Sequence, residues 1–510
     1  MTQNDNDKVK GIPENAYTEL KPGEEYHPVM PPTKTVPEVS FWSVSWGLLM
    51  AIIFSAAAAY LGLKIGQVFE AAIPIAIIAV GLSVVSGRKG ALGENVMIQS
   101  IGANSGVIVA GAIFTLPALY ILNLEAHFYQ VFLSSLLGGV LGILFLIPFR
   151  KYFVSDMHGK YPFPEATATT EVLVSGEKGG KQARLLLISG LIGGIYDFII
   201  ATFGWWAEVF TTRVIPFGAQ LADRAKLVFK INVGSAVMGL GYIIGLKYAA
   251  IIAAGSFVGW FVIIPIINYF APGITVPVGN NVTNILANMS VEDIFANYVR
   301  PIGIGGIAMA GVIGIIRSSG IIKKAFGLAI SETFSKKQKA SKEELRTRRD
   351  IPMAIIAGGI VVTAILILIF FYFGVVHNLY HALLALLIVM IIAFLFTTVA
   401  ANAIAIVGTN PVSGMTLMTL IITSLIMSSA GLSGQSGMVA ALIIGGVVCT
   451  ALSMAGGFIT DLKIGYWLGS SPYKQESWKF LGALVSAATV GGVIILLNKT
   501  YGFTGEGALV

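Results

Sequence analysis

The chain alternates between long apolar runs and short polar stretches. Runs of about 20 apolar residues are long enough to cross a bilayer as helices, and they recur from residue 41 to residue 497. The predicted spans are 41–62, 69–86, 98–122, 129–149, 185–204, 233–250, 251–270, 302–321, 352–374, 382–401, 404–428, 437–457 and 477–497. The pattern therefore predicts an all-α polytopic membrane protein with about thirteen transmembrane helices.

The composition narrows the class of protein. Of 510 residues, 55% are hydrophobic and 12% are charged, whereas soluble domains carry about 25% charged residues. No soluble stretch is long enough to be a nucleotide-binding domain, and no Walker loop, HExxH pair or recognisable nucleophile motif is present. The sequence therefore predicts neither an enzyme nor a cofactor or metal site. The net charge of +7 lies mainly in loops, so it concerns topology rather than nucleic acid.

Lysine and arginine residues cluster in a few loops. Nine of them lie between residues 323 and 349, and further groups lie at 88–89 and 150–184. Basic loops stay in the cytoplasm, so we expect these loops and the N-terminus to be cytoplasmic in a protein of the cell inner membrane. Basic residues at 205–232 would then lie outside, which indicates either an amphipathic surface helix there or a span count wrong by one.

A weak internal echo divides the chain. Phe54-Ser-Ala-Ala-Ala-Ala resembles Phe396-Thr-Thr-Val-Ala-Ala, and each run reaches a glycine twelve positions on, at Gly66 and Gly408. Such a repeat predicts two related bundles with a binding site at their interface, in either inverted or parallel orientation. The predicted divisions are a flexible cytoplasmic tail at 1–40, a first bundle at 41–321, a basic cytoplasmic loop at 322–351 and a second bundle at 352–510.

The segment 94–106 is polar although apolar runs flank it. Its polar side chains include Glu94, Asn95, Gln99, Asn104 and Ser105. A charge at bilayer depth costs about 3 kcal/mol on insertion scales, and broken backbone survives there only where it lines a cavity or lies inside protein. The segment therefore predicts a broken helix that contacts a solute. The alternative is a polar loop entry followed by a polar interface between helices.

A second break is predicted within residues 408–416. Asn410 precedes Pro411 between two glycines, and proline frees a backbone carbonyl that can bind substrate or ions. Thr409, Asn410 and Ser413 are the candidate contacts, and an ordinary loop between two spans is the alternative. The repeat aligns this break with residues 67–74, which contain Glu70.

A third stretch, Tyr161-Pro-Phe-Pro-Glu-Ala-Thr-Ala-Thr-Thr-Glu-Val-Leu173, predicts a short helix that begins near Glu165. Proline suits a helix start, and a glutamate at this position is favoured as an anion. The alternative is a cytoplasmic connector with an ordinary N-terminal glutamate.

Several of these stretches resemble one known family. Gly62-Leu63-Lys64, the segment 94–106 and Tyr161-Pro-Phe-Pro-Glu-Ala-Thr-Ala, in this order, resemble the oligopeptide transporter family, as does the stretch from Asp461-Leu-Lys to Pro472-Tyr-Lys-Gln. The resemblance is closest to bacterial members, which are related to the yellow stripe-like metal-chelate transporters. Family members usually continue past the point where this chain stops, so the second bundle is expected to be truncated at its C-terminus.

The resemblance implies a proton-coupled secondary transporter that imports small oligopeptides or metal-chelate complexes. It strengthens Glu165 as the leading candidate for proton coupling. Among the other carboxylates of the sequence, Glu94, Glu70 and Glu171 are the next choices. The implied partners are a small-molecule substrate, protons and the lipid bilayer, with no nucleic acid, and a homo-oligomer is compatible with the sequence. The alternatives are a channel or a membrane-embedded enzyme that uses Glu94 or Glu165 as an acid or base.

Overall fold

A computed structural model gives the arrangement of the helices. It describes residues 12–504 except 66–67, 69–70, 125, 179–180, 245, 279–284, 304, 307–308, 311–312, 314–315, 317–319, 321–344, 409 and 411. At 64–65, 177–178, 181–187, 201, 236, 240, 243–244, 248 and 413 it describes the backbone alone. The described chain forms two compact units, residues 1–184 with 311–510 and residues 185–310.

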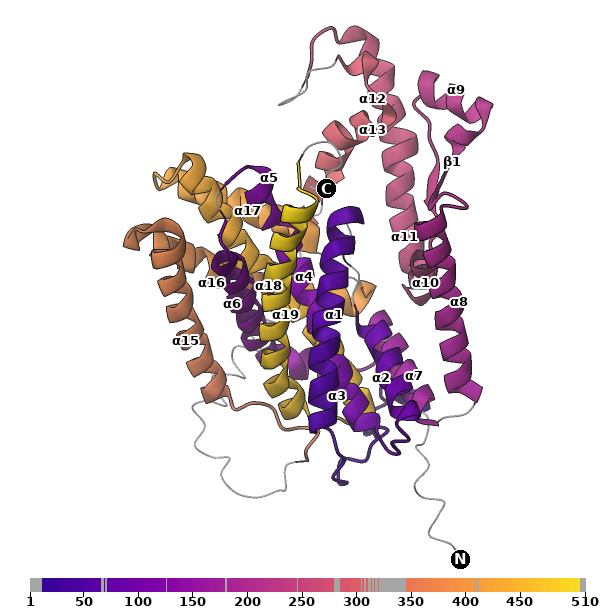
Figure 1. The fold of residues 1–510 in the computed structure, drawn as a ribbon, viewed down its shortest axis with the longest axis vertical. Coiled ribbons are helices and arrows are strands. Elements are labelled where there is room, and N and C mark those ends of the chain that lie inside the picture. Colours follow the sequence, from indigo (N-terminus) through magenta and orange to yellow (C-terminus); the bar gives the residue numbers. More distant parts are fainter. Residues whose placement is uncertain are drawn as a thin grey trace, which may run out of the picture. The chain divides into compact units, whose positions relative to one another are not determined.

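Within the described residues, the regular elements of the first unit are all helices (Figure 1). Its α-helices are α1 (Phe41–Ile65), α2 (Ala72–Val85), α3 (Leu92–Gly102), α4 (Asn104–Ile113), α5 (Pro117–Ile121), α6 (Phe128–Leu146), α7 (Pro164–Lys178), α15 (Met353–Phe371), α16 (Leu379–Val407), α17 (Val412–Ser429), α18 (Gly434–Leu468) and α19 (Pro472–Thr500). Short 3-10 or π turns are η1 (Glu14–Ala16), η2 (Ile147–Phe149), η3 (Lys151–Asp156) and η9 (Tyr372–Val376).

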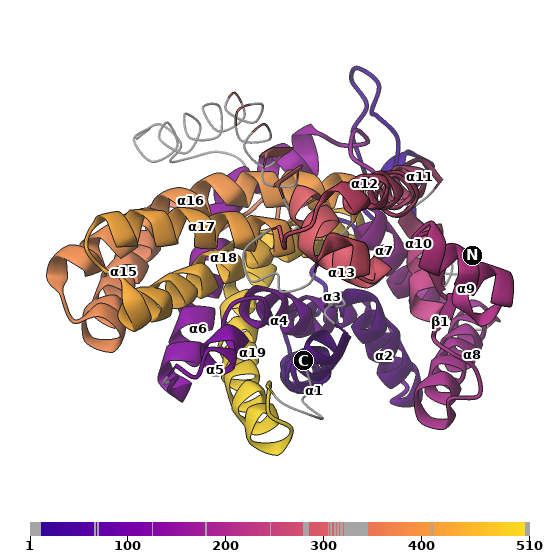
Figure 2. The same cartoon turned by 90° about the horizontal axis from the view of Figure 1, so that it is seen from above.

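Helix α18 is the centre of this unit. It packs against α4, α6, α16 and α17, while α19 packs against α1, α4 and α6 (Figure 2). The close approach to α6 follows from Gly138 and Gly142, because a Cβ atom on either would collide with a main-chain carbonyl of α18. Small residues four apart let membrane helices approach closely in this way. Nearly every residue of α18 from Ala440 to Leu468 is buried as a result.

The second unit contains α8 (Lys181–Phe203), which enters it at Leu185, and a small hairpin. Its remaining elements are β1 (Val209–Thr211), η4 (Thr212–Val214), α9 (Pro216–Arg224), β2 (Lys230–Asn232), α10 (Ser235–Ile244), α11 (Leu246–Phe257), η5 (Val258–Ile263), α12 (Ile264–Phe270), η6 (Ala271–Gly273), η7 (Leu286–Asn288), α13 (Val291–Ile294) and η8 (Phe295–Val299). Strands β1 and β2 pair antiparallel, with Phe210 opposite Ile231. A helix therefore does lie within 205–232, as one reading of the basic residues there expected.

The spans agree with an all-α polytopic membrane protein. Within the described residues, eight helices are long and apolar enough to cross a membrane, and three shorter apolar helices overlap the predicted spans 69–86, 185–204 and 404–428. The last of these predicted spans also contains the end of α16. The predicted pair 233–250 and 251–270 corresponds to α10 and to a single long span, Ala249–Gly273. Most of the predicted span 302–321 lies among residues whose placement is not described.

The units differ from the division that the sequence predicts. Helices α4 and α6 of the predicted first bundle pack directly on α18 and α19 of the predicted second bundle, while residues 185–310 form a compact unit of their own. Gly138 and Gly142 of α6 permit the close packing on α18. The repeat stays a prediction.

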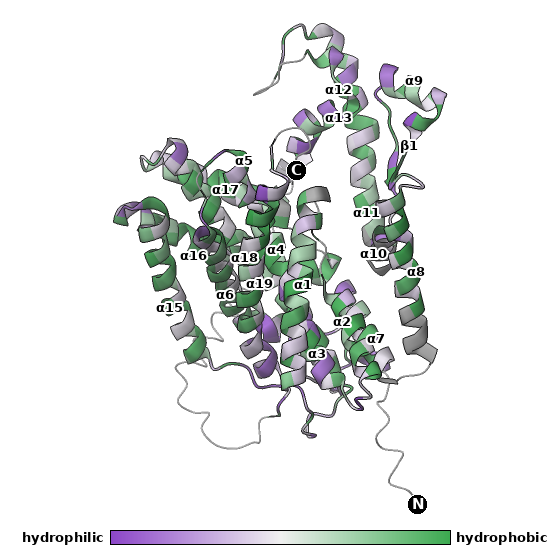
Figure 3. Ribbon diagram, in the orientation of Figure 1, coloured by the Kyte–Doolittle hydropathy of each residue, from purple (hydrophilic) through white to green (hydrophobic). Residues whose placement is uncertain are grey.

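Polar contacts gather at one end of the first unit, where hydrophilic residues lie near the ends of α3 and α19 (Figure 3). Residues 12–40, part of the predicted flexible tail, pack against the end of α18: Met30 N donates to Leu468 O over 2.9 Å. Glu38, which is buried, pairs with Arg346 and Lys474 at 2.7 and 3.0 Å. These contacts join the chain's N-terminal segment and the described end of the basic loop at the same end of the unit.

Candidate functional site

The first predicted break separates α3 from α4 at Ala103. Ala103 N still donates to Gln99 O over 2.8 Å, so the interruption is local. Gln99, Ser100, Asn104 and Ser105 are 0–1% exposed, and the Asn104 side-chain NH2 donates to Ile101 O over 2.9 Å. The polar half of the segment 94–106 therefore lies inside the first unit, where lipid cannot reach it.

The second predicted break lies between α16 and α17. Gly408 has φ +77°, a left-handed conformation that ends helices and favours glycine. The Asn410 NH2 group donates to Ser453 O over 2.9 Å, and the Ser453 hydroxyl donates to Val107 O over 2.8 Å. Ser453 of α18 thus connects the second break to α4, one turn after the first break.

The proline-rich stretch docks against the second break. Phe163 N donates to Ala405 O over 2.9 Å, and the Pro164 ring lies 3.2 Å from the position that a Cβ atom on Gly408 would take. Helix α7 begins at Pro164, so Glu165 lies in its first turn and is buried, as the sequence predicts for the helix start. The three predicted stretches therefore meet inside one unit.

A buried ion pair lies close to the first break and was not recognised from the sequence. Lys479 Nζ lies 2.5 Å from Asp461 Oδ2, and both residues are 0–1% exposed. Gln99 Nε2 donates to Asp461 Oδ1 over 2.7 Å, and Lys479 Nζ donates to Ser100 O over 2.9 Å. The sequence feature that could have revealed this pair is a lysine inside the predicted span 477–497, because a charged side chain within a membrane span is costly unless it is paired.

Lys463, the lysine of the Asp-Leu-Lys motif, makes contacts separate from those of Asp461. Lys463 Nζ donates to Val154 O over 2.7 Å and lies 4.8 and 5.0 Å from the ring centres of Tyr466 and Trp467. Cations bind the faces of aromatic rings in this way. The motif thus supplies one residue to the region of the first break and one to the packing at the end of α18.

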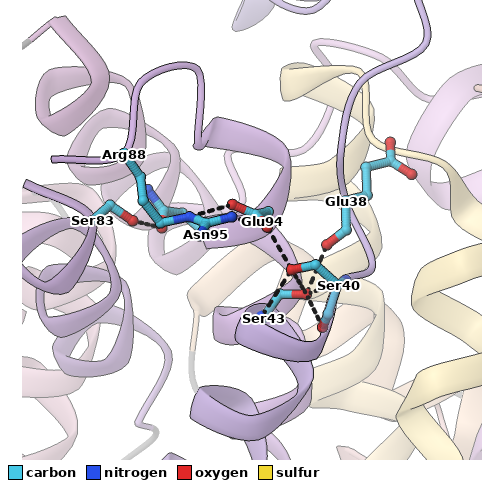
Figure 4. A network of polar contacts seen from close by, with 7 residues as sticks. All are labelled: Glu38, Ser40, Ser43, Ser83, Arg88, Glu94 and Asn95. Carbon is cyan, nitrogen blue, oxygen red and sulfur yellow. Dashed lines mark hydrogen bonds and ion pairs between the residues drawn. The ribbon is translucent and has the colours of Figure 1, made fainter. Parts of the chain in front are cut away.

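Glu94 and Asn95 lie at the start of α3, beside the ends of α1 and α2 (Figure 4). Arg88 donates to both oxygens of Glu94 over 3.0 and 2.8 Å, and the Ser40 hydroxyl also donates to Glu94. The Ser83 hydroxyl donates to Asn95 Oδ1 over 2.6 Å. Glu94 precedes Asn104 by ten residues, or about 15 Å along a helix. Glu94 and Asn95 therefore lie together at the start of α3, apart from Asn104.

The remaining predicted residues are Thr409, Ser413, Glu70 and Glu171. Thr409 and Glu70 lie outside the described residues, and only the backbone of Ser413 is described, in the first turn of α17. Glu171 is exposed on α7 and accepts a hydrogen bond from the Tyr17 hydroxyl over 3.1 Å. Partial desolvation of Tyr17, which is 36% exposed, together with the nearby Glu171 charge raises the pKa of Tyr17 above its usual range.

Several oxygens at the two breaks have no hydrogen-bond partner within the described part of the chain. They are Gln99 Oε1, Ser100 Oγ, Asn104 Oδ1, Ser105 Oγ and Asn410 Oδ1. A buried polar atom without a partner costs about 1–3 kcal/mol, and each such atom calls for an explanation. Throughout the described part of the chain, no three His, Cys, Asp or Glu side chains lie together as a metal site would need. The arrangement suits the binding of a polar solute by neutral groups.

Comparison with known proteins gives independent evidence of the family. The model of the family described as "OPT oligopeptide transporter protein" matches residues 38–508. The chain is also 27% identical, over 483 residues, to a Haemophilus influenzae protein named "Putative oligopeptide transporter", which covers 88% of this chain and 71% of that protein. A family match across nearly the whole chain confirms the resemblance seen in the motifs. The chain therefore belongs to the oligopeptide transporter family, a family of membrane transporters.

Proposed function

We propose that the protein is a proton-coupled secondary transporter that imports small oligopeptides or metal-chelate complexes across the cell inner membrane. The observation that carries this proposal is the meeting of two helix breaks at Ser453. Broken helices that meet inside a bundle supply polar backbone and side-chain groups for a solute at membrane depth. The name of the Haemophilus influenzae relative favours peptides over chelates.

A carrier fits the geometry better than the channel that the sequence left open. An open pore would expose polar side chains along a water-filled path, whereas Gln99, Asn104 and Ser453 are completely buried. Completely buried polar groups are expected of an occluded carrier, in which the solute site opens to one side at a time. Residues 99–105, Asn410 and, by their sequence position, Thr409 and Ser413 are the proposed solute contacts. Glu94 and Asn95 would act at the entrance to this region.

Glu165 remains our proposed proton-coupling group. It is buried in the first turn of α7, next to the second break. A carboxyl group at such a position changes its solvation when the break rearranges, and desolvation favours the protonated form. Solute movement and proton binding would then be linked through Pro164 and Gly408. Glu171 is exposed and so ranks below Glu165, while Glu70 lies outside the described residues.

The test is uptake into proteoliposomes of labelled peptides and metal chelates, with and without an imposed proton gradient. Wild-type protein should accumulate one of these classes above its external concentration only when the gradient is present. Glu165→Gln mimics the protonated carboxyl, so it should retain exchange of the solute and lose accumulation. Glu19→Gln, at an exposed site, is the control and should behave as wild type. Accumulation by Glu165→Gln equal to that of wild type would move the coupling role to another carboxylate.

A further inference from the structure

Residues 12–30 pack on the C-terminal end of α18, and we call them the N-terminal strap. The last carbonyl groups of an α-helix have no partner inside the helix. Val29 N donates to Trp467 O over 3.2 Å, and Met30 N donates to Leu468 O over 2.9 Å. The strap therefore supplies hydrogen-bond donors to carbonyl groups that α18 itself cannot satisfy.

Trp467 and Gly159 fix the course of the strap. Trp467 Nε1 donates to Ala16 O over 2.9 Å, and the ring of Tyr17 packs edge-on against the Trp467 ring, with centres 5.0 Å apart. Gly159 has φ +74°, and a Cβ atom there would collide with the main chain of Thr18. The strap therefore lies in direct contact with the turn that contains Gly159.

His158 is a titratable group beneath the strap. Its side chain is buried, and its ring lies 5.0 Å from the Tyr26 ring, measured between centres. His158 Nε2 lies 2.9 Å from Asn15 O, and Nδ1 lies 3.1 Å from the Tyr466 hydroxyl. Because a carbonyl oxygen only accepts, Nε2 carries a hydrogen and donates to Asn15 O. Nδ1 of the neutral ring then accepts from Tyr466, so the neutral ring satisfies both contacts.

A second proton on this ring is unfavourable while the strap is docked. It would place a cation in a buried site, and the Tyr466 hydroxyl could no longer donate to Nδ1. Lys463 Nζ already lies 4.8 Å from the centre of the Tyr466 ring. Burial lowers the pKa of His158 below its ordinary value of about 6.5, against the opposing effect of the hydrogen bond to Asn15 O. The Lys463 charge also lowers this pKa, whereas Glu24 on the strap raises it.

The charged and titratable groups around His158 come from the strap, from α18 and from its own loop. They are Glu24 and Tyr26 on the strap, Lys463 and Tyr466 on α18, and Asp156, Arg150 and Arg348, which act on Tyr466. The two carboxylates in this set, Glu24 and Asp156, are exposed, and water and salt screen exposed charges. The surroundings therefore give a protonated His158 little compensation.

We propose that the N-terminal strap is a pH-sensitive device, which protonation of His158 releases from the end of α18. The docked state favours the neutral ring, so the released state binds the proton more tightly. Docking is therefore complete above about pH 6.5, the ordinary pKa of histidine, and weakens as the pH falls below that value. One proton is involved, so the docking equilibrium changes by at most about tenfold per pH unit.

The strap also reaches the second break through Trp467. The ring centre of Trp467 lies 6.5 Å from that of Phe163, and Phe163 N donates to Ala405 O at the second break. Release of the strap removes the contacts of Ala16 and Tyr17 with Trp467, so it should loosen the proline-rich stretch. The predicted cytoplasmic location of the N-terminus would expose the strap to protons that the transporter carries inward. That consequence rests on the proposed function, whereas release of the strap does not.

The test is hydrogen–deuterium exchange of the purified full-length chain in detergent, read by mass spectrometry on peptides that contain Val29 and Met30. The two conditions are about pH 7.5 and about pH 5.5, one unit on either side of the ordinary pKa of histidine. Wild type and each variant are compared at the same pH, so the pH dependence of exchange itself cancels. His158→Gln keeps a donor for Asn15 O but cannot be protonated. The ratio of the wild-type rate to the His158→Gln rate should rise at the lower pH, by up to about tenfold.

Three further variants separate the charge of His158 from its packing. His158→Lys also supplies a donor but carries a charge, so its strap should exchange faster than that of His158→Gln at about pH 7.5. His27→Gln is the matched control, because His27 is an exposed histidine of the same strap, and it should behave as wild type at both pH values. Gly159→Ala should give the exchange of a released strap at both pH values, because its Cβ atom would collide with the strap.

Three results would overturn the proposal. They are a ratio of wild-type to His158→Gln rates that does not change with pH, equal exchange in His158→Lys and His158→Gln, and loss of the pH dependence in His27→Gln. Peptides that contain Phe163 should exchange faster whenever the strap is released, and unchanged exchange there would overturn the link to the second break. None of these measurements needs uptake, so a failure of strap release and a failure of the proposed transport are distinguishable.

Discussion

Replacing Lys479 by methionine tests whether the buried ion pair stabilises the fold as a unit. Methionine has a similar length and no charge, so the substitution leaves the Asp461 carboxyl group buried beside Gln99 without its cation. Lys479 Nζ also donates to Ser100 O, and that bond is lost with the charge. Asp461→Asn makes the opposite change, because it leaves the Lys479 ammonium without its carboxylate.

The magnitude follows from the burial of both groups. Breaking a buried pair by removing one partner costs about 3–5 kcal/mol in free energy of unfolding. The double variant Asp461→Asn/Lys479→Met leaves no isolated charge, so we expect it to be more stable than either single variant. The resulting non-additivity should be about 3 kcal/mol or more.

The measurement is a double-mutant cycle on the purified protein, with unfolding in mixed micelles of increasing SDS fraction followed by tryptophan fluorescence. The cycle isolates the coupling between the two side chains. Effects of the single variants that add within about 0.5 kcal/mol would refute the reasoning, because independent sites behave in that way. A double variant less stable than both single variants would refute it equally.

Two further predictions concern packing and topology. Gly482→Ala should lower uptake and should lower the free energy of unfolding by about 1–3 kcal/mol through overpacking, since its Cβ atom would lie 2.7 Å from Ile101 O. The control is Gly492→Ala on the same helix, which should be neutral or stabilising because its Cβ atom would have nothing within 4 Å. Thermal denaturation of both variants is the measurement, and an equal loss of stability at the two sites would contradict this prediction. A cysteine at Ser341, among residues outside the described part of the chain, should resist an impermeant thiol reagent added to intact cells, because the basic loop is predicted to be cytoplasmic. Labelling of that cysteine from outside would reverse the proposed orientation.

The sequence by itself determined the class of the protein and the local character of its polar stretches. Runs of about 20 apolar residues identify spans because bilayer thickness fixes the length of a crossing helix. Gly408, Asn410 and Pro411 predict the break between α16 and α17 because these residues end helices through their own backbone geometry. The burial of Gln99 and Asn104 was predictable as well, since exposure of these side chains to lipid is costly.

Only the tertiary structure decided which of these stretches meet. Helices that are apolar all round show no polar face that would reveal their neighbours, so the sequence could not place Ser453 between Asn410 and Val107. It could not pair Asp461 with Lys479 either, because that pairing depends on how α18 and α19 rotate against each other. Glu94 illustrates the same limit: the polar segment predicts a solute contact there, and only the folded chain shows that Arg88 and Ser40 donate to its carboxylate. The choice of partners depends on close contacts at small residues such as Gly138, Gly142 and Gly482, and those contacts exist only in the assembled bundle.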